Sequence, residues 1–181
     1  GGTAVPLHLP LQDPETIAAA IDAVVADGRM PDALVLNASP PFATASFVKT
    51  TPEDFRTQFE PGVIGNHALV SALWKQSFRK KRDGHIVALL TSALGPKPTP
   101  QMTPYITAKA ALRTMLECAS VEYGRGGLRI SFVSPGFTET PMLAGFNPLL
   151  LDMARAQTEN GRFLTPEEVA GTVLDALANP P

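Results

Sequence analysis

The chain has 181 residues, of which 44% are hydrophobic and 18% charged, and its formal net charge is −2. This is the profile of an ordinary globular domain with room for a core, and no basic excess points to nucleic acid. One cysteine, Cys118, excludes an internal disulfide and a cysteine-clustered metal site, and the three histidines lack metal-ligand spacing. Without a membrane-length apolar run or a visible signal peptide, we expect a cytoplasmic protein and no membrane partner.

The first half of the chain predicts two strands and two helix starts. Residues 4–11 are apolar with two prolines, which favours a short edge strand. Asp13-Pro14-Glu15 combines an N-cap, a first-turn proline and an acid, and Gly28 is the stop signal of that helix. Residues 33–37 predict a strand buried on both faces of a parallel sheet. A polar loop follows, and Thr51-Pro52-Glu53 repeats the helix-start pattern.

The second half predicts two further strands and four helices. A long helix is expected over 62–82, broken near Pro61, and its Arg79-Lys80-Lys81-Arg82 end is interpreted as a cationic helix terminus and not as a basic patch. The remaining elements follow in chain order: a strand over 85–90, a helix over 103–123 with Thr103 as N-cap and Cys118 buried, a strand over 128–133, a weakly signalled helix over 140–160, and a capping box at Thr165-Pro166-Glu167-Glu168.

Strands and helices therefore alternate, and the strands are short and apolar. This order predicts βαβ units and a mainly parallel sheet with helices on both faces. There is no internal repeat and no linker, so residues 1–181 are expected to form a single domain. Both ends of the chain are interpreted as cut, because it starts Gly1-Gly2 and stops directly after a helix.

One tyrosine–lysine pair is a candidate for acid–base chemistry. Tyr105 and Lys109 are four residues apart in an expected helix, so they share one face of it. A nearby ammonium stabilises a phenolate and lowers the tyrosine pKa. Ser92 follows an expected strand, and open α/β sheets hold ligands at the carboxyl ends of their strands. A bare pair of this kind is usually part of a solvated polar helix face, and its context has to decide.

The context resembles the short-chain dehydrogenases/reductases almost from end to end. Ser92 precedes Tyr105 by thirteen residues, the family's spacing between catalytic serine and tyrosine. Two segments resemble short family motifs: Leu34-Val35-Leu36-Asn37-Ala38-Ser39 is similar to N-N-A-G, and Tyr105-Ile106-Thr107-Ala108-Lys109 is similar to Y-x-x-x-K. Two later segments also resemble the family: Ser134 to Met142 is similar to its P-G-x-x-x-T loop, and Arg162 to Ala170 is similar to its late helix start.

The resemblance implies a three-layer, Rossmann-like, doubly wound α/β fold, and the departures from it imply an incomplete one. The glycine-rich turn that holds the cofactor pyrophosphate in the family has no counterpart here, so the first βαβ unit and the last strand are expected to be absent. Residues 33–36 would then form an exposed hydrophobic edge. Four positions depart from the family's pattern. Leu36 replaces an Asn and Ser39 replaces a Gly in the N-N-A-G segment, and Pro10 replaces an acidic residue. Gly62 replaces the family's fourth catalytic residue, an Asn, for which Asn66, one turn later, is a candidate substitute.

The resemblance further implies an NAD(P)-dependent interconversion of a ketone or aldehyde and an alcohol. It assigns Ser92, Tyr105 and Lys109 as catalytic residues, and no metal. Its cofactor-binding residues are Asn37, Ala38, Tyr105, Lys109, Pro135, Gly136 and Thr140, with NAD and NADP both open.

Three further expectations concern ligands and partners. Segments 95–100 and 142–151 are expected to line an apolar substrate pocket, and helices 62–82 and 103–123 to pair in a homodimer or homotetramer of the complete protein. The isolated chain is expected to bind dinucleotide weakly or not at all. The alternative is a non-catalytic module of the same fold that binds a ligand or partner.

Overall fold

The computed structural model describes residues 3–158 and 160–181, and three parallel strands form its centre. Strands β1 (Ala33–Leu36), β2 (Gly84–Leu89) and β3 (Leu128–Val133) lie in the order β1-β2-β3. Leu36 pairs with Ala88, and Leu89 pairs with Val133, so all three strands end at the same edge of the sheet. This confirms the predicted incomplete, mainly parallel α/β sheet.

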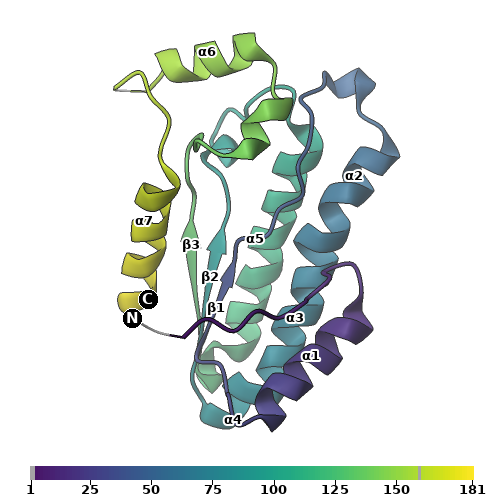
Figure 1. Ribbon diagram of the computed structural model, residues 1–181, viewed down its shortest axis with the longest axis vertical. Helices are drawn as coiled ribbons and strands as arrows, with labels where there is room; N and C mark the ends of the chain where they lie inside the picture. The colour runs from purple at the N-terminus through teal and green to yellow at the C-terminus, as the bar shows by residue number, and fades with distance from the viewer. Residues whose placement is uncertain (1–2, 159) are drawn as a thin grey trace.

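Helices cover both faces of the sheet, as the alternation of elements predicted. Figure 1 shows the sheet between α7 (Pro166–Ala178) on one side and α1 (Pro14–Ala26), α3 (Asn66–Leu73) and α5 (Thr103–Tyr123) on the other. The main core lies between the sheet and the second group of helices. Its fully buried members include Ile17, Phe78, Ile86, Leu112 and Leu116.

The outer edge of the sheet differs from the sequence prediction in two ways. Residues 4–11 form no strand; two prolines remove backbone donors, and only Leu9 and Leu11 pack against the core. In β1, Ala33 is exposed and Val35 is 40% exposed, whereas Leu36 is buried. The expectation of a strand buried on both faces is therefore wrong, and the expectation of an exposed hydrophobic edge is correct.

Residues 52–81 form one continuous helical run in place of a broken helix. It comprises α2 (Pro52–Phe59), a π-helical turn η2 (Glu60–Gly65), α3, a second π-helical turn η3 (Trp74–Phe78) and α4 (Arg79–Lys81). Pro61 lies in the first π turn, where the wider hydrogen-bond pattern accommodates its missing N–H. Gly65 is required there, because a Cβ would overlap the Leu11 carbonyl group.

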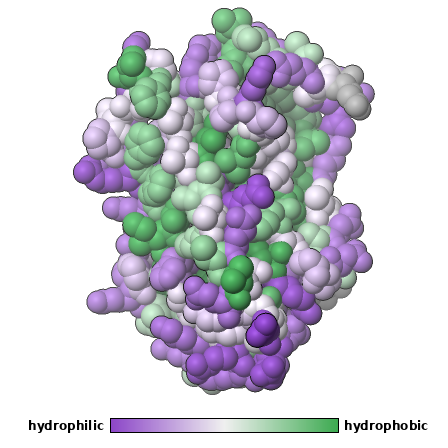
Figure 2. All heavy atoms as spheres, turned by 180° about the vertical axis from the view of Figure 1, so that it is seen from behind, coloured by the Kyte–Doolittle hydropathy of each residue, from purple (hydrophilic) through white to green (hydrophobic). Residues whose placement is uncertain are grey.

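The basic run at the end of this helix is exposed to solvent, as interpreted from the sequence. Arg79, Lys80 and Lys81 form the last turn, and Arg82 ends the helix in the left-handed conformation with φ 55°. Figure 2 shows the opposite face of the molecule, where the lower end that holds α4 is mostly hydrophilic and apolar residues extend through the middle and upper parts. The cations thus lie at a helix C-terminus, where the helix dipole favours them.

The helix expected over 140–160 is interrupted. A 3₁₀ helix η6 (Pro141–Gly145) is followed by extended Phe146, and α6 (Pro148–Ala156) then begins at its own N-cap, Asn147. This second start differs from the predicted single helix, because Asn147 provides an N-cap within the segment. Three other short 3₁₀ turns connect elements: η1 (Phe47–Lys49), η4 (Ser92–Leu94) and η5 (Gly124–Gly126).

Two residues of α5 differ from expectation. Thr103 is the first helical residue and Met102 takes the N-cap position, without a capping side-chain bond. Cys118 is exposed and not buried, because it lies on the outward face of the helix. Gly1 and Gly2 of the expected cut end, and Glu159 within the expected 140–160 helix, lie outside the described residues.

Candidate active site

A cavity of about 620 Å³ opens at the carboxyl ends of the three strands. This is the position at which open parallel sheets hold their ligands. The structure brings together there the predicted residues Asn37, Ser92, Tyr105, Lys109, Pro135, Gly136 and Thr140. Ala38 is exposed and does not line the cavity.

Backbone hydrogen bonds beyond the ends of β2 and β3 position Ser92. The N–H of Leu90 donates to the Val133 carbonyl at 2.7 Å, and the N–H of Ser92 donates to the Pro135 carbonyl at 2.9 Å. Gly136 follows directly, and a Cβ at Gly136 would lie 3.9 Å from the Ser92 Oγ. The serine hydroxyl therefore lies against the glycine of the P-G segment, although the two residues come from different strands.

Lys109 is the one charged residue that lines the cavity among the described residues, and it is 8% exposed. Its Nζ donates to the Leu89 carbonyl at 2.7 Å. Burial lowers the pKa of this ammonium from 10.5 to about 8, because the charged form loses hydration. The side chain can thus release its proton within the ordinary working range of pH.

Tyr105 is half-buried, and its pKa differs in direction from the sequence expectation. Burial is the largest cause and raises the pKa of the phenol, while a hydrogen bond with the Thr91 hydroxyl acts in the lowering direction. The Lys109 Nζ lies 5.8 Å from the ring centroid and is hydrogen bonded to a strand carbonyl. Desolvation therefore sets the direction of the shift, and the expected lowering of the phenol pKa by the ammonium is not observed in this arrangement.

Thr91 and Phe42 are cavity residues that the sequence analysis missed. The Thr91 hydroxyl accepts a hydrogen bond from the Ala93 N–H at 3.2 Å and also bonds Tyr105. Phe42 stacks on the Tyr105 ring with centroids 4.6 Å apart and planes at 17°. Residues after Asn37 were read as a polar loop, yet a large aromatic residue so soon after a strand end was an available signal.

The loop after Gly136 is tied to the start of α7. The N–H of Leu164 donates to the Phe137 carbonyl at 2.9 Å, and the N–H of Glu139 donates to the Leu164 carbonyl at 2.8 Å. These two bonds form a short parallel bridge between Thr138 and Leu164. The segment that resembles the family's late helix start therefore supports the loop that resembles its P-G-x-x-x-T segment.

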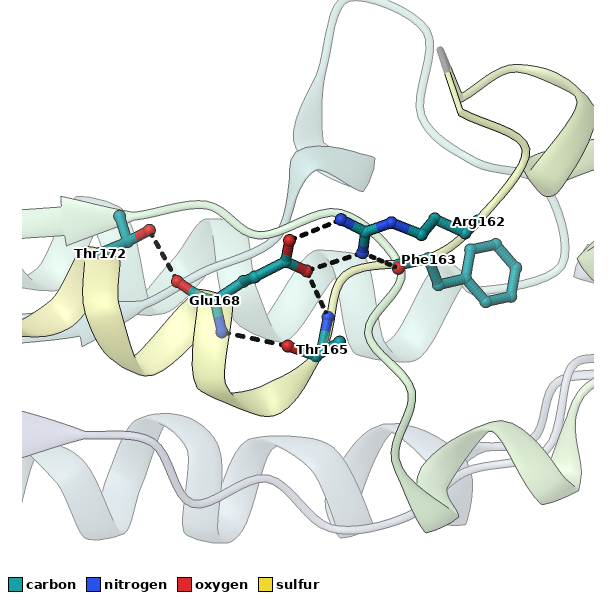
Figure 3. A network of polar contacts seen from close by, with 5 residues as sticks. All are labelled: Arg162, Phe163, Thr165, Glu168 and Thr172. Atoms are coloured by element: carbon teal, nitrogen blue, oxygen red, sulfur yellow. Dashed lines mark hydrogen bonds and ion pairs between the residues drawn. The ribbon is translucent and has the colours of Figure 1, made fainter.

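A polar network, drawn in Figure 3, fixes this end of α7. Both guanidinium NH groups of Arg162 bond the Glu168 carboxylate, at 2.6 and 2.9 Å. The Glu168 carboxylate also accepts from the Thr165 N–H at 2.8 Å, and the Thr165 hydroxyl accepts from the Glu168 N–H at 3.2 Å, which completes the predicted capping box. Chiefly because of the Arg162 bond, the pKa of Glu168 falls from 4.5 to about 2.

The proposed substitute for the family's fourth catalytic residue lies elsewhere. Asn66 is 3% exposed, and its side-chain amide donates to the Gly62 carbonyl at 3.0 Å within the helical run. Neither Asn66 nor Gly62 lines the cavity, and Pro10 does not line it either. The amide of Asn66 thus satisfies the backbone at the π turn.

No helix in the described part of the chain combines the length and apolar character needed to cross a lipid bilayer. Among residues 3–158 and 160–181, no group of three or more His, Cys, Asp or Glu side chains is arranged to hold a metal ion.

Comparisons with known proteins place the chain in a family. Residues 1–179 match the family described as enoyl-(acyl carrier protein) reductase. The chain is 30% identical over 179 residues to the Caenorhabditis elegans protein named "Probable 2,4-dienoyl-CoA reductase 3", covering 96% of this chain and 57% of that protein. It is 28% identical over 176 residues to cis-4-hydroxycyclohexanecarboxylate dehydrogenase of Sinomonas cyclohexanicum, covering 96% and 69% respectively.

A solved structure supports the same fold. Gluconate 5-dehydrogenase of Burkholderia cenocepacia, in complex with NADP and tartrate, superposes with a TM-score of 0.82 at 21% identity, covering 91% of this chain and 64% of that one. The chain therefore spans little more than half of the first relative's length and about two thirds of this neighbour's. With the family profile matched over residues 1–179, the chain belongs to the short-chain dehydrogenase/reductase superfamily of oxidoreductases.

Proposed function

We propose that the whole protein is an NAD(P)-dependent oxidoreductase that interconverts a ketone or aldehyde and an alcohol, with Ser92, Tyr105 and Lys109 as its catalytic residues. The observation that carries this proposal is their convergence: three side chains from β2's end and from α5 line one cavity of about 620 Å³. The family relationship supports oxidoreduction in general, and the convergence supports this particular site.

The residues around the cavity suit one end of a dinucleotide. Pro135, Gly136 and Thr140 would hold the nicotinamide and Lys109 its ribose, while Asn37 would lie under the cofactor; the bound cofactor would supply or accept a hydride. Ala38 does not line the cavity, so no contact to the cofactor is assigned to it. The described residues include no glycine-rich turn at a helix N-terminus for the pyrophosphate. We therefore propose that this chain alone binds NADH or NADPH weakly, and micromolar affinity in a titration would contradict this.

Each catalytic side chain has a separate task at the substrate oxygen. The Tyr105 hydroxyl donates its proton to the carbonyl oxygen during reduction and takes it back during oxidation. The Ser92 hydroxyl donates a hydrogen bond to the same oxygen and orients it. The Lys109 ammonium, with a pKa of about 8, favours the phenolate that remains when the proton has left.

Replacement of Tyr105 by Phe tests this assignment in the full-length enzyme. The chain has two tyrosines, and Tyr123 stacks on Trp74 in another part of the molecule, so Tyr123→Phe is a matched control. With NADH or NADPH and a panel of ketones and alcohols, Tyr105→Phe should abolish turnover and the control should retain it. Retention of most of the rate in Tyr105→Phe would show that the acid is assigned wrongly.

A second candidate is a non-catalytic module of the same fold. It is favoured by Gly62, which stands where the family has a catalytic Asn, and by the bond of Asn66 to the Gly62 carbonyl outside the cavity. If the wild-type full-length protein turns over no carbonyl or alcohol while still binding a ligand in this cavity, the module is correct.

We propose further that two copies pair through the faces of the long helices. Val121 on α5 is 86% exposed and Ile64 on η2 is 55% exposed, and a hollow of about 320 Å³ lies between α3 and α5 near Trp74 and Tyr123. Light scattering on the full-length protein and its Val121→Glu variant tests this pairing, because a buried glutamate would dissociate the dimer or tetramer.

A further inference from the structure

An aromatic wall stands beside the proposed proton donor. Phe42 covers the Tyr105 ring in a stacked arrangement, with centroids 4.6 Å apart. Phe146 packs on Phe42 at 5.0 Å, and Phe137 packs edge-on against Phe146 at 5.9 Å. These rings come from three separate segments, and all of them line the cavity that holds Tyr105.

The segment that carries Phe42 is held on both sides. The N–H of Ala45 donates to the Gln101 carbonyl at 3.0 Å, just before α5, and the N–H of Asn147 donates to the Thr44 hydroxyl at 3.1 Å, just before α6. Gly145 allows close backbone contact, because a Cβ there would lie 3.0 Å from the Phe42 carbonyl oxygen. The position of the Phe42 ring is thus set by three tertiary contacts.

The side of the cavity next to Tyr105 is apolar. Met102, Met142 and Leu143 complete the surface begun by the aromatic residues, and Lys109 is the single charged residue in the described lining. The Nζ of Lys109 is already bound to the Leu89 carbonyl. A carboxylate next to the reacting carbon would lose its hydration there without gaining a free cation, whereas a flat apolar group would gain contacts.

We propose that Phe42 is a specificity-determining residue, which with Phe146 selects uncharged carbonyl substrates that carry a flat apolar group next to the carbonyl. This inference rests on the proposed function and names the substrate class of the same site. Phe42 contacts the group beside the carbonyl and takes no part in the proton transfer, so its effect is a discrimination between substrates.

The kinetic test compares three ketones with the full-length enzyme: acetophenone, acetone and pyruvate. Phe47 is a matched control, because it lies on the same connection, is 73% exposed and does not line the cavity. In Phe42→Ala, the ratio of kcat/KM for acetophenone to that for acetone should fall about tenfold, a typical effect of one apolar contact. Phe42→Leu should lose less, and Phe47→Ala should keep the wild-type ratio.

Several kinetic results overturn the inference. The first is an acetophenone-to-acetone ratio of kcat/KM in Phe42→Ala that stays within twofold of the wild-type ratio. The second is a wild-type kcat/KM for pyruvate that equals or exceeds that for acetophenone. The third is an enzyme that turns over other carbonyls in a Tyr105-dependent reaction but does not turn over acetophenone. The last result leaves the proposed function standing. Turnover that survives in Tyr105→Phe sinks the proposed function instead.

A second measurement needs no turnover. Within these 181 residues carrying Tyr123→Phe, Tyr105 is the single remaining tyrosine, and the ultraviolet difference between this protein and its Tyr105→Phe variant isolates the titration of Tyr105. Removal of the Phe42 ring admits water to the phenol, so the Phe42→Ala change should lower the pKa of Tyr105, and Phe47→Ala should leave it unchanged. An unchanged titration in Phe42→Ala overturns the contact on which the inference depends.

Discussion

The buried ammonium of Lys109 makes the stability of the fold depend on pH in a definite direction. The unfolded chain keeps this proton up to its ordinary pKa of 10.5, whereas burial lowers the pKa in the folded chain to about 8. Between these values the unfolded state binds more protons, so the free energy of unfolding rises as the pH rises. The difference corresponds to about 3 kcal/mol, at about 1.4 kcal/mol per pH unit.

The measured change should be smaller than this limit. The hydrogen bond from the Lys109 Nζ to the Leu89 carbonyl, 2.7 Å long, favours the charged form and opposes desolvation. We therefore expect an increase of about 1–3 kcal/mol across the whole interval, and roughly half of it by pH 9.5. Keeping the pH at or below 9.5 avoids ionising Tyr105, whose pKa is raised.

Urea unfolding at pH 7.5, 8.5 and 9.5 provides the assay, with Lys109→Met as the variant that lacks the group. Lys80, exposed on α4, gives the matched control Lys80→Met, because it removes a lysine without removing a buried charge. Wild type and Lys80→Met should both gain stability relative to Lys109→Met as the pH rises. A constant difference between wild type and Lys109→Met over this range would refute the argument that burial controls this proton.

Three further predictions concern positions outside the cavity. Gly65→Ala forces a Cβ into the Leu11 carbonyl and should lower the free energy of unfolding by more than about 2 kcal/mol. At Gly62 a Cβ meets nothing within 4 Å, so Gly62→Ala should be neutral or should stabilise the fold by up to about 1 kcal/mol. Equal urea midpoints for the two variants would contradict this contrast. Thr165→Ala removes the N-cap of α7 and should cost about 1 kcal/mol in the same assay, and no loss would show that the cap is redundant. The stability that the low pKa of Glu168 provides is present above pH 4.5 and is lost as the pH falls towards 2. Glu168→Gln should therefore lack this part of the acid unfolding transition. Acid unfolding curves of wild type and Glu168→Gln that superimpose would contradict the contribution of the Arg162–Glu168 pair.

Helix starts and central strands were predictable because their signals are local. The Asp/Thr-Pro-Glu segments begin α1, α2 and α7, and each N-cap side chain accepts the expected backbone hydrogen bonds. Strands β2 and β3 lie within one residue of their predicted bounds, since short apolar runs between turn signals occur in few other places. Such signals depend on the chain's own neighbours in sequence, and tertiary contacts do not override them here.

Three of the failed predictions depend on long-range contacts. Residues 4–11 have the composition of a strand, but strand pairing depends on a partner that local composition does not specify. The π turn around Pro61 depends on the close approach of Leu11 to Gly65, which are far apart in sequence. Phe42 was read as part of a polar loop because its contact with Tyr105 crosses more than sixty residues.

The side chains of the cavity support the proposed reaction independently of the family relationship. The described lining holds one ammonium, one phenol, hydroxyls of serine and threonine, and the side-chain amide of Asn37, with no histidine and no carboxylate. A serine nucleophile for acyl transfer requires an adjacent base, and the Lys109 Nζ is bound instead to the Leu89 carbonyl. Glycoside hydrolysis requires a pair of carboxylates, which this lining does not provide. What the lining can do is hold a carbonyl oxygen with the Ser92 hydroxyl and exchange one proton with it through Tyr105, which is the protein's share of a carbonyl reduction.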